Sequence, residues 1–317
     1  MSGLHHSVTT AFGVSGIVKE KGYYKTTDGT RMIRKTKDGR GQTWARYQIA
    51  EHCCKNGYPW LDRYHLSKSG HPYVFAEGES YIMTDLINYR EADFSDSQEF
   101  LAVVKAMAHW HNCARNITFS GEASLHKGRP PISLAETFKI QGEALDTIRK
   151  RIRKQSQLSD FDVLFVKHYP SYRERIQKAQ QLLENTGYIR RCYKARQMNH
   201  ICHGGLKEDC LRICNNQVYI TKLDQAIIDY QINDLCALIR RREKGQKIME
   251  HSQIIEAYSQ VTPLEQEEEV ILEAMLLYPA AFVKIVSEYY QKKRKWIPVA
   301  MANKMKEILA NESSQNF

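Results

Sequence analysis

Long apolar runs are absent from this chain of 317 residues. None approaches the roughly 20 apolar residues that a membrane-spanning helix requires, so no membrane span is expected. No apolar segment follows a basic N-terminus, so no secretory signal peptide is expected either. The glycines at positions 13, 16 and 22 fit neither G-x-G-x-x-G nor G-x-x-x-x-G-K-[ST], and are interpreted as turn residues rather than a phosphate loop.

The eight cysteines lack a C-x-x-C pair and any tight framework. A chain of this length can bury a core without covalent staples, so reduced thiols in a cytosolic setting are expected. Zinc remains an alternative, because five potential ligands lie close together in the sequence. These are His200, Cys202, His203, Cys210 and Cys214.

An acidic excess is also lacking, because 46 lysines and arginines oppose 36 acidic residues and give a net charge of +10. This excess favours nucleotides or other phosphorylated ligands, although a solvated basic surface explains it equally well. The densest basic run, residues 292–295, could contact nucleic acid. Cations are also common at the end of a helix, so nucleic acid is not the expected partner.

The first third of the chain has the pattern of short strands around one helix. Residues 1–11 are polar and are expected to fray. Alternation and turn residues predict strands, and a 3.6-residue period followed by Asn-Gly predicts the helix. The predicted strands lie within 12–36 and at 73–76 and 81–87, and the helix at 43–55. This inventory is typical of a small antiparallel sheet with one packed helix.

The remainder is predicted to be helical, interrupted by one hairpin. Amphipathic periodicity predicts the helices, and Pro279 separates two of them. They lie at 97–115, 133–155, 160–186, 231–243, 252–259, 263–277, 280–295 and 298–311. The order predicts an α+β, bilobal protein kinase-like fold, with a small antiparallel β lobe at residues 1–86 and a large helical lobe at 87–317.

The interrupting stretch, residues 200–234, carries the candidate chemistry. A polar loop is followed by the predicted strands LRIC and QVYITKL, which a turn at Asn215-Asn216 joins. Phosphoryl transfer needs an acid or base at the acceptor hydroxyl, ligands for Mg²⁺ and a cation at the phosphates. A loop followed by a hairpin is how small-molecule kinases of this fold present those groups.

Several motifs occur in order along the chain. They are YIMTDLINYREADF, AMAHWHNCAR, CHGGL, YITKLDQA and NDLCALIRR. Together they resemble the CotS-type spore coat proteins of endospore-forming bacteria, which are themselves similar to aminoglycoside and choline phosphotransferases. The resemblance covers most of residues 12–300. It implies an aminoglycoside phosphotransferase-like fold and a place in the spore coat.

Three residues depart from the family's C-H-G-D-L-x-x-x-N and Y-x-I-D-F-D patterns. Gly205 occupies the catalytic base position, Cys210 that of a metal-binding asparagine, and Lys222 that of a metal-binding aspartate. Glycine accepts no proton, a thiol is a poor Mg²⁺ ligand, and an ammonium repels a cation. No metal is therefore expected, while His203 remains as a residue that braces the loop.

Three routes would preserve an active enzyme. Asp209 adjoins Cys210, and Asp224 lies two residues past Lys222 on the same predicted strand face, so a shifted frame could use either acid. Lys222 could also replace Mg²⁺ by compensating phosphate charge. The structural interpretations are that Asp224 pairs with a nearby arginine and that Lys222 faces solvent in an emptied cleft.

A nucleotide site would also involve the first lobe. The resemblance places either Arg34 or Lys35 at the phosphate-binding lysine, with Glu51 as the candidate partner, and the hinge near Met83 and Thr84. Together with Lys222, these residues form a candidate cleft for ATP without Mg²⁺.

The resemblance and its departures predict a pseudokinase that serves as a binding or assembly module in the spore coat. Its expected partners are other coat proteins, and its expected place of synthesis is the mother-cell cytoplasm. The alternative is an atypical small-molecule or sugar kinase that uses Asp209 or Asp224. A third, weaker hypothesis is a basic nucleic-acid-binding protein.

Overall fold

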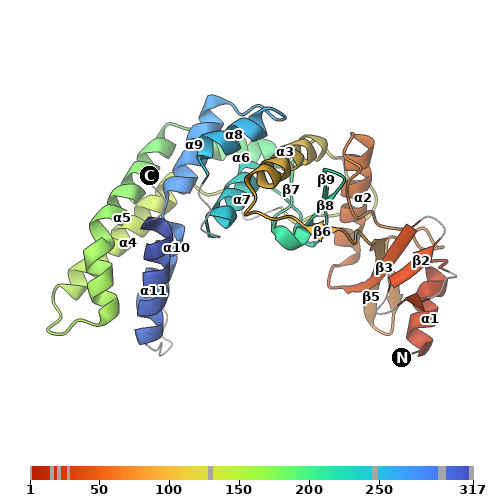
Figure 1. Ribbon diagram of the computed structural model, residues 1–317, viewed down its shortest axis with the longest axis horizontal. Coiled ribbons are helices and arrows are strands. Elements are labelled where there is room, and N and C mark those ends of the chain that lie inside the picture. Colours follow the sequence, from red (N-terminus) through yellow and green to blue (C-terminus); the bar gives the residue numbers. More distant parts are fainter. Residues whose placement is uncertain are drawn as a thin grey trace. The chain divides into compact units, whose positions relative to one another are not determined.

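The computed structural model describes residues 2–14, 18–19, 23–26, 29–127, 131–244, 249–291 and 298–313. Its strands are β1 Val18–Lys19, β2 Tyr23–Thr26, β3 Gly29–Thr36, β4 Val74–Ala76, β5 Glu79–Asp85, β6 Arg90–Glu91, β7 Ile201–Cys202, β8 Leu211–Cys214, β9 Gln217–Ile220 and β10 Ile227–Ile228. Its helices, shown in Figure 1, are α1 Ser2–Ala11, α2 Arg40–Lys55, α3 Ser97–Cys113, α4 Leu134–Ile152, α5 Asp160–Glu184, α6 Tyr188–Gln197, α7 Ile232–Lys244, α8 His251–Ser259, α9 Gln266–Leu277, α10 Ala280–Gln291 and α11 Pro298–Ser313. Two 3₁₀ turns, η1 Glu208–Cys210 and η2 Leu223–Gln225, belong to residues 200–234, which are called the central stretch below.

The predicted small sheet is confirmed. Its strands follow the order β1-β2-β3-β5-β4 and pair antiparallel throughout. Strands β3 and β5 form its centre, where Arg34 lies opposite Ile82 and Lys35 opposite Tyr81. Because successive side chains of a strand point to opposite faces, Arg34 and Lys35 cannot share an environment.

The N-terminal segment does not fray, and that prediction was wrong. Residues 2–11 form helix α1, which packs against β4. Val8 and Phe12 are buried in one cluster with Tyr81 and Met83 of β5. Burial of two large apolar side chains explains why a polar-looking segment is held on the sheet.

Some predictions fall on parts of the chain that the structure does not cover. Gly16, Gly22 and the basic run at residues 292–295 lie outside the described residues. Gly13 does act as a turn glycine, with φ +72°, a backbone conformation that glycine adopts without strain. Helix α2 ends where Asn-Gly predicted, because Gly57 takes φ +100° just after the C-cap residue Asn56.

The hairpin of the central stretch is confirmed in part. Strands β8 and β9 pair antiparallel, with β6 on the other side of β8. Asn215 and Asn216 both have positive φ, 48° and 62°, which is the geometry of a two-residue hairpin turn. The second strand ends at Ile220, however, rather than continuing to Leu223 as predicted.

Internal contacts divide the chain into two compact units. The first contains residues 1–129, 194–235 and 256–263, and the second contains 130–193, 236–255 and 264–317. These ranges differ from the predicted lobes 1–86 and 87–317, whose boundary stays a prediction. The loop at residues 203–210, which contains Gly205 and Cys210, is called the degenerate loop. It belongs to the first unit, as does the five-stranded sheet.

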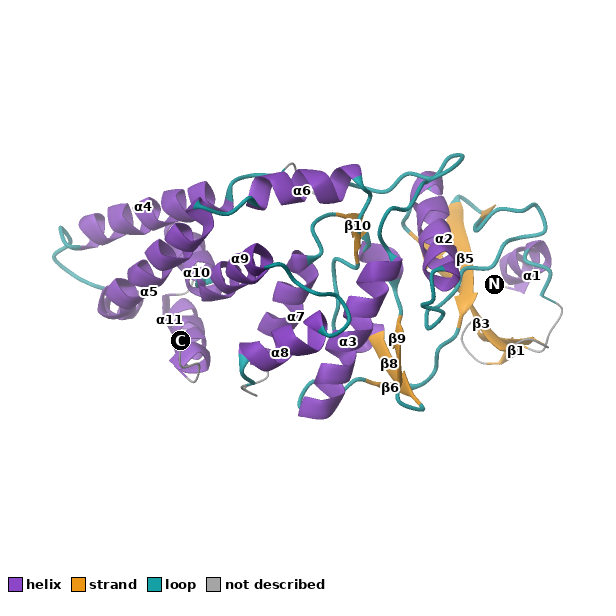
Figure 2. Ribbon diagram, turned by 90° about the horizontal axis from the view of Figure 1, so that it is seen from above, coloured by secondary structure: helices purple, strands orange, loops and turns teal. Residues whose placement is uncertain are grey.

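The second unit is helical. Helices α4 and α5 lie side by side, and α9 and α11 also pack on α5 (Figure 2). Sequence periodicity missed helix α6, because its residues YIRRCYKARQ offer only Cys192 and Ala195 as fully buried apolar side chains. Within the described residues no single helix is long and apolar enough to cross a membrane; α9 with α10 meets the length and composition test only as a pair bent by 43°.

Candidate functional site

The degenerate loop is anchored by one buried carboxylate. Asp234, at the start of α7, accepts hydrogen bonds from the backbone N–H groups of His203 (2.6 Å) and Gly204 (3.0 Å). His111 of α3 lies with Nε2 3.2 Å from the same carboxylate. Burial alone would raise the pKa of Asp234, but the hydrogen bonds from His111 and from the backbone N–H of Gly204 lower it. The loop is therefore held by an ionised acid.

His203 braces this loop, as the sequence predicted. Its ring is 1% exposed, and Nε2 lies 2.9 Å from the carbonyl oxygen of Thr221. A carbonyl oxygen only accepts, so the Nε2 atom must carry the proton. Burial lowers the pKa of His203, which keeps the ring neutral. His111 is likewise buried and hydrogen-bonded, with Nδ1 2.9 Å from the hydroxyl of Tyr258.

The side chain of Gln225 occupies the space beside Gly205. A Cβ atom built on Gly205 would overlap the carboxamide oxygen of Gln225. The neighbouring Gly204 has φ +74°, and its Cβ would overlap the backbone oxygen of Gln225. Gln225 follows the hairpin in turn η2, so this turn fills the space beside both glycines.

Cys210 is a protonated thiol. Its Sγ lies 3.4 Å from Oδ1 of Asp209 and 3.7 Å from the carbonyl oxygen of Gly205. Burial, together with the charge of Asp209, raises the pKa of Cys210 to about 11. A thiol in that state is no ligand for a hard cation.

Lys222 does not lie on a strand, which corrects the predicted shared face with Asp224. It takes a left-handed conformation with φ 62° and ψ 58° after β9 has ended. Its Nζ lies 2.9 Å from Oδ2 of Asp209, and Nζ of Lys207 lies 3.2 Å from the same oxygen. Burial would raise the pKa of Asp209, but hydrogen bonds from Lys222, Cys210 and Lys207 lower it to about 2.

Asp224 pairs with an arginine, which confirms the structural interpretation of that residue. Its Oδ1 accepts a hydrogen bond of 2.7 Å from Nη2 of Arg34 in β3. Arg46 of α2 donates to the backbone oxygen of Asp224. The two acids proposed as substitutes, Asp209 and Asp224, are thus each bound by cations.

The structure separates Arg34 from Lys35. Arg34 is partly buried beside Asp224, whereas Lys35 extends to the other face, with Nζ 3.4 Å from Glu79 and more than half of both side chains exposed. Glu51 is not the partner of either, so that prediction was wrong. It accepts hydrogen bonds of 2.7–2.9 Å from Arg63 instead.

The two hinge residues differ in environment. Met83 points its side chain into the cluster under α1, and its backbone oxygen accepts a 2.8 Å hydrogen bond from the N–H of His65. Thr84 is fully buried, and its hydroxyl has no hydrogen-bond partner among the residues that the structure describes. Their participation in a nucleotide site stays a prediction.

Sequence reasoning missed Asp62, a buried acid beside this cluster. Its Oδ2 accepts a 3.2 Å hydrogen bond from the backbone N–H of Lys222, while its Oδ1 has no partner within the described ranges. Burial raises the pKa of Asp62 to about 7, although Lys222 N–H and the charge of Arg34 act in the opposite direction. The available signal was an aspartate that directly follows the apolar residues Trp60 and Leu61.

Metal binding finds no support in the described part of the chain. No three His, Cys, Asp or Glu side chains there are grouped so that they could hold an ion. All eight cysteines are unpaired, and six of them are buried. The five zinc candidates therefore do not assemble into a site among these residues.

Comparisons with known proteins identify the family and the fold of the chain. The family model described as "Spore coat putative kinase YutH" matches residues 15–316. No curated protein matches the chain. Among solved structures, an aminoglycoside phosphotransferase from Alicyclobacillus acidocaldarius subsp. acidocaldarius DSM 446 is similar, with a TM-score of 0.79 at 14% identity over 98% of this chain and 92% of that one.

Two further structures share the fold. Spectinomycin phosphotransferase APH(9)-Ia, in complex with ADP and spectinomycin, has a TM-score of 0.55 at 10% identity over 99% of this chain and 98% of its own. Amicoumacin kinase hAmiN, in complex with AMP-PNP, Ca²⁺ and Ami, has a TM-score of 0.53 at 13% identity over 96% of this chain and 90% of its own. The fold is thus the predicted α+β, protein kinase-like fold of the aminoglycoside phosphotransferase type.

Proposed function

Since the chain belongs to the family described as spore coat putative kinase YutH, we propose that it is a pseudokinase that serves as a binding or assembly module in the spore coat. Association with the coat follows from the family. The absence of phosphate transfer and the role in assembly are the proposed parts. Other coat proteins are the proposed partners, and the mother-cell cytoplasm is the proposed place of synthesis.

The ion pair between Lys222 and Asp209 carries this proposal. Lys222 stands at the position where the family places a metal-binding aspartate. Its ammonium lies 2.9 Å from Oδ2 of Asp209 and forms an ion pair with that acid. Two positively charged groups repel each other strongly at short range, so Mg²⁺ is disfavoured beside Lys222 and Lys207. Without a metal and without a side chain at Gly205, the usual route of phosphoryl transfer lacks both of its main contributions.

The same arrangement supports binding of ATP without Mg²⁺. Arg34, Lys207 and Lys222 supply three cations against the two carboxylates of Asp209 and Asp224, and the nearby carboxyl of Asp62, with a pKa of about 7, is only partly ionised at neutral pH. A net positive cleft compensates phosphate charge in the way a metal ion otherwise would. The similar folds of APH(9)-Ia and hAmiN have been solved with ADP and with AMP-PNP, respectively, which makes a nucleotide the first ligand to test.

Thermal unfolding with ATP, in the presence and absence of Mg²⁺, tests the proposal. We expect a rise in Tm that does not need Mg²⁺ and that Lys222→Ala abolishes. Ligand at about 100 times its Kd stabilises a protein by about 2.7 kcal/mol, which is a readily measured shift. A rise that requires Mg²⁺ and disappears in Asp224→Ala, together with transfer of phosphate from Mg-ATP to a coat extract or a small alcohol, would overturn it in favour of an atypical kinase.

A further inference from the structure

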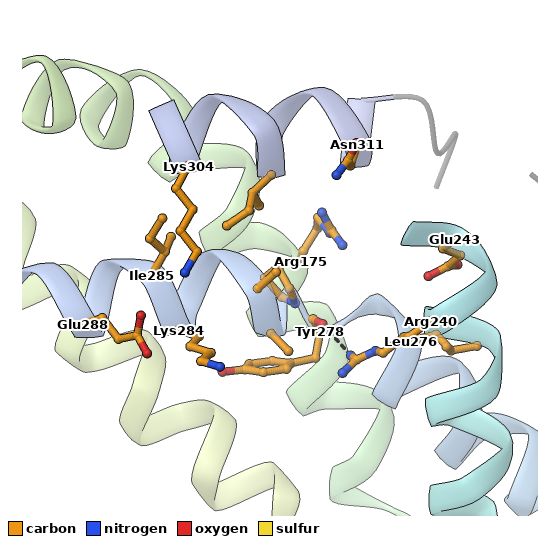
Figure 3. A pocket seen from close by; sticks show the side chains of 14 residues that line it. Arg175, Arg240, Glu243, Leu276, Tyr278, Lys284, Ile285, Glu288, Lys304 and Asn311 are labelled. Atoms are coloured by element: carbon orange, nitrogen blue, oxygen red, sulfur yellow. Dashed lines mark hydrogen bonds between the residues drawn. The ribbon is translucent and has the colours of Figure 1, made fainter. Parts of the chain in front are cut away.

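A cavity of about 620 Å³ lies within the second compact unit (Figure 3). Helices α5, α7, α9, α10 and α11 contribute its lining. A volume of this size is typical of sites for small organic ligands. None of its lining residues belongs to the degenerate loop, so the proposed function makes no use of it.

The lining of this cavity carries more positive than negative charge. Its cations are Arg175, Arg240, Lys284 and Lys304, and its acids are Glu243 and Glu288. Glu243 is already engaged, because its Oε1 lies 2.7 Å from Nε2 of His251. Lys284 and Lys304 form no ion pair within the part of the chain that the structure describes. The cavity therefore offers two ammonium groups to an anion.

The ends of two helices also contribute to the electrostatics of the cavity. Arg240 donates to the backbone oxygens of Met275 and Tyr278, the latter at 2.8 Å, and Arg175 donates to that of Leu277 at 3.3 Å. The arginines thus compensate the negative C-terminal end of α9. The positive N-terminal end of α10, which begins at Ala280, has no acidic residue in its first turn. An anion in the cavity would find this end uncompensated.

The walls between the charges are apolar and fixed. Leu276, Ile285 and Ile308 line the cavity, and Tyr278 closes one side. The Tyr278 ring stacks on Phe138 with a centroid distance of 3.9 Å, and its hydroxyl donates to Gln141. A ring held from two directions gives a flat apolar surface at low entropic cost.

We infer that this cavity binds a small organic dianion that carries an apolar group, such as an aryl phosphate monoester. The two ammonium groups of Lys284 and Lys304, with the N-terminus of α10, take the doubly charged head. The wall formed by Tyr278 and Ile285 takes the apolar body. This site is separate from the proposed nucleotide cleft and does not depend on it.

Isothermal titration with phenyl phosphate at about 0.15 M salt tests the inference, because that ionic strength screens weak surface attraction. We expect saturable binding that is weakened at least about tenfold in the Lys284→Gln/Lys304→Gln double variant. Lys306→Gln is the matched control, since Lys306 lies on α11 but does not line the cavity. Equal affinity in the double variant, after circular dichroism has shown that it folds, would overturn the inference.

Two comparison ligands and one variant distinguish this site from simpler modes of binding. Inorganic phosphate and benzyl alcohol should each bind at least about tenfold more weakly than phenyl phosphate. Inorganic phosphate lacks the apolar group, and benzyl alcohol lacks the dianionic group. Equal binding of either would contradict the combined site. Binding should persist in Lys222→Gln, and its loss there would place the ligand in the kinase-like cleft and refute the second site.

Discussion

The ammonium of Lys222 lies 2.9 Å from Oδ2 of Asp209. One residue of this pair stands where the family has a metal ligand, and the other is an acid that could have substituted for a lost ligand. Because they form an ion pair, the charge of Lys222 neutralises the acid that could have taken over the role of the metal ligand. Lys207, 3.2 Å from the same oxygen, reinforces that outcome.

Substitutions of the two neighbouring cations on β3, Arg34 and Lys35, form a matched pair of variants that tests nucleotide binding. Arg34→Gln should weaken binding of ATP in the absence of Mg²⁺ by at least about tenfold, or about 1.4 kcal/mol, because Arg34 pairs with Asp224 in the proposed nucleotide site. Lys35→Gln should change it less than about twofold, because Lys35 extends to the opposite face beside Glu79. Fluorescence titration with a labelled ATP analogue measures both. Equal effects would mean that the nucleotide does not contact this face of the sheet.

The adjacent glycines of the loop should respond differently to alanine. Gly204→Ala should destabilise the protein by about 2–4 kcal/mol, because φ is +74° and the obstacle is a backbone oxygen. Gly205→Ala should cost less than about 1 kcal/mol, because the obstacle is the end of the flexible Gln225 side chain. Urea unfolding gives both values. The opposite ranking would show that turn η2 does not pack against the loop in this way.

Loss of the loop anchor should be costly. Asp234→Asn replaces one acceptor oxygen with an N–H₂ group, although both oxygens accept hydrogen bonds from His203 and Gly204 in a buried site. We expect a loss of about 2–4 kcal/mol in the free energy of unfolding. Asp229→Asn, in the same stretch but only half-buried, is the control and should cost less than about 1 kcal/mol. Equal losses for the two variants would argue against a special role of the anchor.

Asp62 should make stability depend on pH. The pKa of Asp62 is about 7 in the folded protein, against 3.8 for an ordinary aspartate. Between these values the folded protein keeps a proton that the unfolded chain has lost, so the free energy of unfolding falls as the pH rises toward 7. Asp62→Asn removes this loss and should be more stable than the native protein by up to about 4 kcal/mol at pH 8.

The comparison at low pH completes that experiment. At pH 5 the advantage of Asp62→Asn should shrink to about 1–2 kcal/mol, because only the loss that has accumulated between pH 3.8 and pH 5 remains, at about 1.4 kcal/mol per pH unit. The N–H of Lys222 can still donate to the asparagine oxygen, so the existing hydrogen bond is kept. A difference between the proteins that does not vary with pH would contradict the assignment of Asp62 as the titrating group.

Local patterns predicted much of the architecture. Period-two alternation located β3 and β5, and two consecutive asparagines located the hairpin turn. Charge complementarity predicted that Asp224 would pair with an arginine, although it did not identify Arg34. These features depend on neighbours in sequence or on a single kind of partner, which is why the sequence sufficed.

Other features depend on contacts between distant segments. Helix α1 is held in place because Val8 and Phe12 pack in one cluster with Met83. No pattern within residues 2–12 predicts this contact. The left-handed conformation of Lys222 depends on Asp62, 160 residues away, which holds its N–H. Helix α6 has too few apolar residues for periodicity to reveal it, and the ion pair of Arg191 with Glu267 at 2.5 Å helps to fix it. Tertiary contacts override local signals at each of these places.

The charge pairing in the cleft also constrains how this protein could evolve. A single reversion of Lys222 to aspartate would set a new carboxylate close to Asp209, whose charge would have lost its nearest cation. A reversion at Gly205 would meet the carboxamide of Gln225. The change at position 222 is therefore unfavourable unless Asp209 changes with it, whereas the flexible side chain of Gln225 can move aside for a residue at position 205. Under the proposed function, a metal-binding acid at position 222 would therefore require a change at Asp209 as well, so these two positions are expected to change together.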